Sequence, residues 1–155
     1  MEISIVNTMK KFMLVALFIM GMISSVSAQY ASIESTWVEH NVYSQGYNCM
    51  CVHVELTVDD WQGRAINVSA YIFDSNGNKV IAPYGAPATL RARDGQLCSG
   101  VNSRVDYEST YWEDIQLFVP YNFLRTGSYS CVVQVATTTG VMLTYSDPEY
   151  FTVGR

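Results

Sequence analysis

The sequence contains few positive charges. It holds 9 Lys and Arg against 14 Asp and Glu, which gives a formal net charge of −5 over 155 residues. Proteins that bind nucleic acids or anionic membrane surfaces carry basic patches. The charge balance therefore argues against both kinds of partner.

The sequence also lacks the motifs of common enzymes. There is no Gly-x-Ser-x-Gly elbow, no His-Glu-x-x-His pair and no phosphate-binding loop. Glu108, Glu113 and Asp114 could supply a pair of carboxylates for glycoside hydrolysis. Neighbouring acids in a strand or loop are more often simply solvated, so we expect no enzymatic activity and no cofactor.

The N-terminal segment has the pattern of an export signal. Lys10 and Lys11 precede an apolar run over residues 12–23, and Val26-Ser27-Ala28 offers small residues to a signal peptidase. The apolar run is too short for a membrane span. We expect residues 1–28 to be cleaved, with Met1 or Met9 as the start, and no membrane insertion. Residues 29–155 would then form one domain that is secreted or periplasmic.

The rest of the chain predicts short strands separated by turns. Apolar residues alternate with others over residues 49–58, 65–74, 111–120 and 128–138, so that each strand has one buried face. An Asn76-Gly77 turn is a strong hairpin signal. We also expect short strands near residues 80–81 and 90–92 and a loop over residues 99–109. No segment predicts a helix longer than one turn. We therefore expect an all-β fold, an immunoglobulin-like or C2-like β-sandwich of about seven to nine antiparallel strands.

Several segments resemble a small secreted β-sandwich domain of uncharacterised Bacteroidota-type proteins. The resemblance rests on Trp37–Tyr43 with Gly46, Met50-x-Val52-His53-Val54, Gly95-Gln96 and Asp114–Tyr121. That domain also occurs at the end of larger proteins. The resemblance implies the sandwich fold over most of residues 29–155 and brings no catalytic residues. The chain departs from the pattern at positions 49 and 51, where Cys replaces Gly and a polar residue.

Four cysteines in an exported protein predict at least one disulfide. Cys49 and Cys51 share one strand face about 6–7 Å apart, whereas a disulfide needs Cβ atoms about 3.5–4.5 Å apart. We expect Cys98 to pair with Cys49 or Cys51, with a slight preference for Cys51. Cys131 occupies a core-facing position and would remain a free buried thiol.

A metal site is the alternative for the same strand. Cys49, Cys51 and His53 form a Cys-x-Cys-x-His pattern of ligands that suit Cu(I) or Zn²⁺. A flat strand spaces such ligands too widely for one ion, and His53 belongs to the resembling pattern without the cysteines. We therefore expect no metal and a hydrogen-bonding role for His53.

Aromatic residues are the candidate binding groups. Those at exposed positions can stack on sugars or anchor a protein partner, and the candidates are Trp61, Tyr84, Tyr107 and Trp112. Trp112 is also a candidate for the core. The sequence thus favours a secreted, non-catalytic interaction module for a protein or peptide. The alternatives are a carbohydrate-binding module with an aromatic platform and a protease-inhibitor-like sandwich.

Overall fold

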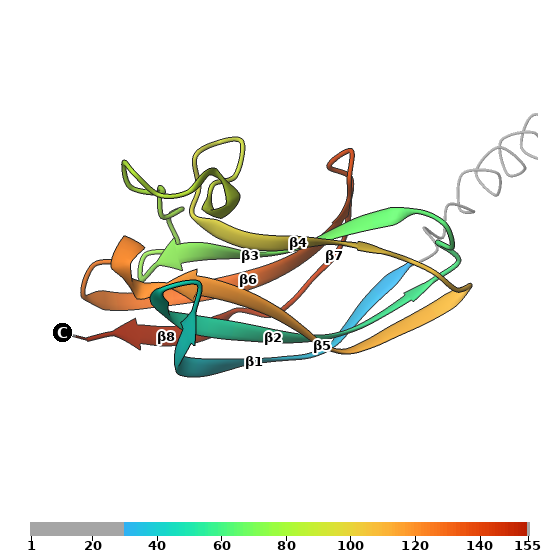
Figure 1. Ribbon diagram of the computed structural model, residues 1–155, viewed down its shortest axis with the longest axis horizontal. Coiled ribbons are helices and arrows are strands. Elements are labelled where there is room, and N and C mark those ends of the chain that lie inside the picture. Colours follow the sequence, from blue (N-terminus) through green and yellow to red (C-terminus); the bar gives the residue numbers. More distant parts are fainter. Residues whose placement is uncertain (1–29, 155) are drawn as a thin grey trace, which may run out of the picture.

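Two antiparallel sheets packed face to face make up the computed structural model, which describes residues 30–154 (Figure 1). Sheet A has the order β1 (Ala31–Ser44), β2 (Tyr47–Asp59), β5 (Ser109–Pro120). Sheet B has the order β4 (Cys98–Arg104), β3 (Ala65–Asp74), β6 (Gly127–Thr137), β7 (Met142–Tyr145), and β8 (Glu149–Val153) also pairs with β6. The all-β sandwich expected from the alternation is confirmed. The predicted signal peptide lies outside the described residues.

The core lies between the sheets and follows the alternation in the sequence. Every second residue of the central strand β2 is fully buried, namely Met50, Val52, Val54, Leu56 and Val58. Ile66, Val68, Ala70 and Ile72 of β3 face them, with Cys131, Val133 and Val135 of β6. Each such aliphatic side chain contributes about 1.5–3 kcal/mol on burial. Cys131 is therefore a core thiol, as expected.

Tight turns join the strands where the sequence places Gly and Asn. Gln45 and Gly46 between β1 and β2 have φ of 50° and 84°, the left-handed conformation of a two-residue hairpin turn. At the end of β3, Asp74 Oδ1 accepts hydrogen bonds from the backbone N–H groups of Asn76 and Asn78. The chain turns here at Gly77, which has a φ of 79°.

The segment of residues 75–97 does not form the short strands expected near residues 80–81 and 90–92. It makes only isolated bridges, such as Ile81 with Gln96, and one turn of 3-10 helix, η1 (Ala88–Leu90). Two residues anchor it: Leu97 is fully buried, and the buried Gln96 side chain donates a hydrogen bond to the Ile72 carbonyl at 2.9 Å. The rest of the segment rises above sheet B (Figure 1).

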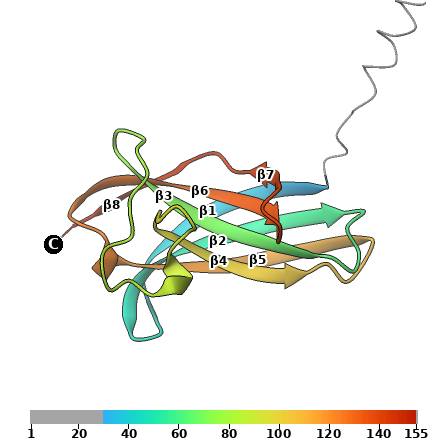
Figure 2. The ribbon, with the colours of Figure 1, turned by 90° about the horizontal axis from the view of Figure 1, so that it is seen from above.

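Strand β4 corrects a second expectation, because residues 99–109 were predicted to be loop. The strand pairs with β3 from Tyr71–Cys98 to Ala65–Arg104. A second 3-10 turn, η2 (Tyr121–Phe123), links β5 to β6. Seen from above, the strands of the two sheets overlap along the long axis (Figure 2). Residues 30–154 contain no helix with the length and apolarity needed to cross a bilayer.

Candidate functional site

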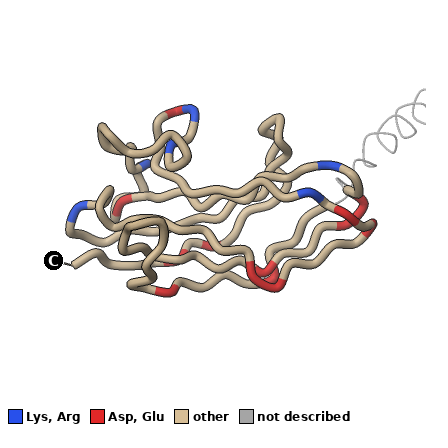
Figure 3. Tube along the Cα trace, in the orientation of Figure 1, with Lys and Arg blue, Asp and Glu red and all other residues tan. Residues whose placement is uncertain are grey.

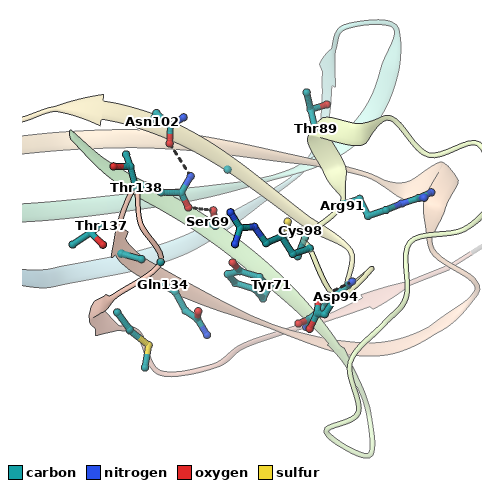
Figure 4. Close-up of a pocket in the computed structure, with 18 of the residues that line it drawn as sticks. Ser69, Tyr71, Thr89, Arg91, Asp94, Cys98, Asn102, Gln134, Thr137 and Thr138 are labelled. Atoms are coloured by element: carbon teal, nitrogen blue, oxygen red, sulfur yellow. Dashed lines mark hydrogen bonds between the residues drawn. The ribbon is translucent and has the colours of Figure 1, made fainter.

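A groove of about 690 Å³ runs over the outer face of sheet B (Figure 4). Its floor is formed by β3, β4 and β6. One wall belongs to the segment of residues 75–97, and the other is the β6–β7 hairpin, with Thr137, Thr138 and Met142. Figure 4 shows Thr89 and Arg91 on one side, Thr137 and Thr138 on the other, and Ser69 and Tyr71 between them.

The floor is polar because the outward positions of β3 are polar. Ile66, Val68, Ala70 and Ile72 point into the core, so the alternate residues Asn67, Ser69 and Tyr71 point into the groove. Ser69 Oγ donates to Asn67 Oδ1, and Asn67 Nδ2 donates to Asn102 Oδ1 at 3.0 Å. Gly100 lies opposite Ser69, and a Cβ at that position would overlap Ser69 Oγ. The missing side chain therefore keeps the middle of the floor open.

The wall formed by residues 75–97 carries positive charge. Residues 30–154 contain six Lys and Arg, and three of them, Lys79, Arg91 and Arg93, line the groove. Asp94 is the one acidic residue among those that line it, and it pairs with Lys79 at 2.6 Å. Arg91 Nη2 donates to the Pro83 carbonyl at 3.2 Å. Among the described residues, neither Arg91 nor Arg93 forms an ion pair.

A second hollow of about 410 Å³ adjoins the groove on the same face of sheet B. Phe73 lines both hollows, and Val132, Pro148 and Tyr150 line the second one. Tyr150 is 81% exposed. Together the hollows form a trough with a hydroxyl- and amide-rich part and an aromatic part.

The four aromatic residues singled out in the sequence do not come together in this trough. Trp61 is half-buried, with its ring 4.9 Å from that of Tyr30 and the Arg64 guanidinium 4.4 Å above it. Trp112 is also half-buried and packs against the core. Tyr84 is fully exposed in the segment above sheet B, and Tyr107 is 69% exposed in the β4–β5 loop. None of the four lines the groove.

The outer face of sheet A holds a side-chain cluster centred on His53. The Trp37 ring stacks on the imidazole with centroids 4.8 Å apart and planes 4° apart. His53 Nδ1 lies 2.7 Å from Asp114 Oδ1, and Nε2 lies 3.3 Å from Glu39 Oε2. These residues belong to three of the segments that carry the resemblance, which thus meet on one sheet face. The hydrogen-bonding role expected for His53 is confirmed.

The His53 cluster links side chains from all three strands of sheet A. His53 is only 6% exposed, and both of its nitrogens are engaged by carboxylates. Burial raises the pKa of Asp114, but hydrogen bonds from Gln116 and His53 outweigh it and hold that pKa below its ordinary 3.8. Both ring nitrogens of His53 therefore face a carboxylate, one from Asp114 of β5 and one from Glu39 of β1.

The cysteine-histidine pattern does not assemble a metal site. Among residues 30–154, no three His, Cys, Asp or Glu side chains are grouped so that they could hold an ion. Cys49 Sγ instead lies 3.6 Å from the Tyr47 carbonyl and 3.9 Å from that of Ser44. Side chains two residues apart along a flat strand lie too far apart to bind one metal ion together.

The predicted disulfide between Cys98 and Cys49 or Cys51 is wrong, and all four cysteines are free and buried. Cys49 and Cys51 point outward from sheet A, whereas Cys98 points outward from sheet B into the groove. The core of the sandwich separates them, which the Cβ spacing of a disulfide forbids. Burial raises the pKa of all four thiols, to about 11 for Cys51, where Asp114 and Glu39 add to it, and to about 12 for Cys131.

Sequence reasoning missed the groove, although part of its signal was present. The alternation that buries Ile66 to Ile72 also turns Asn67, Ser69 and Tyr71 to one outer face. What the pattern could not supply was the pair of walls, which come from distant segments. No protein-family model matches this chain, and no curated protein is significantly similar to it.

Proposed function

We propose that this protein is an exported, non-catalytic binding module whose ligand is an extended glycan lying in the groove of sheet B. The observation that carries the proposal is the groove itself, which lies between two walls and is floored by amide and hydroxyl side chains. Its volume of about 690 Å³ lies within the range of about 300–1,000 Å³ common for ligand sites.

The chemistry of the floor favours a glycan over a peptide. Asn67, Asn102 and Gln134 offer both donors and acceptors, which match the hydroxyl groups of a sugar. Tyr71 and Phe73 add rings to the same face, and Tyr150 extends this surface into the second hollow. An extended peptide is more commonly held by main-chain hydrogen bonds at a sheet edge, whereas this groove lies over the middle of a sheet.

Matched substitutions on the two sheets test the proposal. Isothermal titration would use soluble five- to six-sugar oligosaccharides, namely β-1,4-glucan, mannan and oligogalacturonate, with an unstructured peptide of similar length. Tyr71→Ala and Gln134→Ala should each weaken glycan binding at least tenfold. Tyr111→Ala and Gln116→Ala remove the same side chains from the outer face of sheet A and should leave binding within about twofold.

Two outcomes would contradict the proposal. One is glycan binding that survives Tyr71→Ala and Gln134→Ala while thermal melts show both variants folded. The other is binding of the peptide with no oligosaccharide bound. The second outcome would support the protein or peptide partner favoured by the sequence.

We also propose that the sandwich is of the immunoglobulin-like or C2-like type. The strand orders β1-β2-β5 and β4-β3-β6-β7 support it, because immunoglobulin sandwiches place their first, second and fifth strands in one sheet and their third and sixth in the other. Export is proposed from residues 1–28. Intact-mass analysis of secreted protein should find a chain beginning at Gln29, and a retained leader would overturn export by this signal.

A further inference from the structure

We infer that the glycan bound in the groove is anionic and is selected through its carboxylate or sulfate groups by Arg91 and Arg93. This inference rests on the proposed function and adds the chemical class of the ligand. Three kinds of observation support it: the distribution of charge, the lack of acidic partners for the two arginines among the described residues, and their place on one wall of the groove.

The charge of the groove is opposite to that of the whole chain. Lys79, Arg91 and Arg93 line it with a single acid, Asp94, while the chain as a whole has a net charge of −5. Figure 3 shows acidic residues along the side of sheet A and at one end of the sandwich, and basic residues in the segment above sheet B and at both ends. A positively charged groove attracts negatively charged ligands, even on a protein whose net charge is negative.

The positive charge of the two arginines is not compensated within the described part of the chain. Asp94 is already paired with Lys79 at 2.6 Å, so that pair adds little net charge. Arg91 donates to the Pro83 carbonyl, which is neutral and leaves the charge of the guanidinium intact. A guanidinium binds carboxylate or sulfate with two parallel hydrogen bonds, which an ammonium group cannot do in the same geometry.

The position of the arginines couples charge to the polar floor. Both belong to the exposed wall formed by residues 75–97, which lies beside the floor residues Ser69 and Tyr71. The Arg91 guanidinium points away from these floor residues and donates to the Pro83 carbonyl (Figure 4). A sugar on the floor would therefore carry its acidic substituent toward the wall. Neutral sugars could use the floor alone, and the arginines would add selectivity for the charged ones.

The test compares charged and neutral oligosaccharides on the full exported protein. Isothermal titration in 50 mM NaCl would use oligogalacturonate, a sulfated chondroitin oligosaccharide and neutral β-1,4-glucan of equal length. We expect at least one charged oligosaccharide to bind tenfold or more tightly than the glucan. Which of the two binds identifies carboxylate or sulfate as the preferred group. Raising the salt to 0.5 M should weaken the charged ligand and leave the glucan unchanged.

Variants assign the selectivity to the groove. Arg93→Gln should weaken the charged ligand about tenfold or more, since a hydrogen bond to a charged group is lost. Arg91→Gln should weaken it less, because its guanidinium points away from the floor and contributes through its charge. Their affinity for glucan should stay the same. Arg104→Gln is the matched control, because Arg104 is exposed, lies outside the groove and pairs with Asp106. It should change neither affinity.

The outcomes separate this inference from the proposed function. Equal affinity for charged and neutral oligosaccharides, or an effect of Arg104→Gln as large as that of Arg93→Gln, would overturn the anionic selectivity and leave glycan binding intact. Binding of a poly-glutamate peptide in place of every oligosaccharide would overturn both. Thermal melts should show Arg91→Gln and Arg93→Gln folded, because both side chains are exposed.

Discussion

Strand β6 offers a matched pair of substitutions that tests the arrangement of the two sheets. Val132 and Val133 are neighbours, and β6 pairs with β3 at both residues. Val133 is fully buried in the core, whereas Val132 is only partly buried on the outer face and lines the second hollow. The substitutions Val132→Ala and Val133→Ala therefore remove the same atoms from opposite faces of one strand.

The expected difference can be worked out from burial. Two methyl groups removed from the core cost about 1.6 kcal/mol of transfer free energy, and the cavity left behind raises this to roughly 2–3 kcal/mol for Val133→Ala. Both variants also lose the β-propensity of Val, up to about 1 kcal/mol, and this cost is shared. We expect Val133→Ala to be less stable than Val132→Ala by about 1–2 kcal/mol.

Thermal and urea unfolding would measure the difference. For a domain of this size 1 kcal/mol corresponds to roughly 4 °C in Tm, so the two midpoints should differ by about 4–8 °C. Urea curves with equal slopes would show that only stability has changed. Equal destabilisation by the two substitutions, or a larger effect at Val132, would refute the assignment of faces on β6.

Three further predictions follow from the cysteines and from the His53 cluster. All four thiols are buried and have raised pKa values, so a thiol reagent at pH 8 should react slowly with the native protein. After unfolding without reductant, the reagent should find four thiols. A count below four would show that a disulfide forms after all. His53→Leu removes the ring that lies between Asp114 and Glu39 and should cost about 1–3 kcal/mol in urea unfolding. His40→Leu, at an exposed ring bonded to Tyr121, should cost less than about 1 kcal/mol. The lowered pKa of Asp114 means that the unfolded chain binds its proton first as the pH falls. Stability should therefore drop as the pH falls below about 3.8 and through the folded pKa, and Asp114→Asn should flatten that part of the profile.

The fold was predictable wherever one face of a strand is apolar. Met50 to Val58 and Ile66 to Ile72 alternate without interruption, and both form strands with the expected faces inward. Strand β4 escaped prediction because it lies at the edge of sheet B and much of it is not apolar. Its residues Gly100, Asn102 and Arg104 face solvent or the groove, so that little of the alternation remained in the sequence.

The site was less predictable, because it depends on contacts between distant segments. The sequence pattern favoured Trp61 and Tyr107 as aromatics in loops, but neither lines the groove or the second hollow. The groove needs residues 75–97 and the β6–β7 hairpin to stand on the same face, which is a property of sheet order and not of local pattern. The disulfide failed for the same reason, since strand alternation cannot say which sheet a cysteine belongs to.

Under the proposed export into an oxidising compartment, the burial of all four cysteines would have a kinetic consequence. Cys131 lies in the core and is shielded only once the two sheets close, and the outward-pointing Cys49, Cys51 and Cys98 are buried only once the chain around them has folded. Oxidation therefore competes with folding during the short time in which the chain is open. A chain that joined Cys98 to Cys51 in that interval could not close the sandwich, because the native fold holds these residues on opposite sides of the core. Slow folding would thus divert molecules into a covalently trapped form. Refolding yield should rise when a reductant is present at the start and should be insensitive to its later removal.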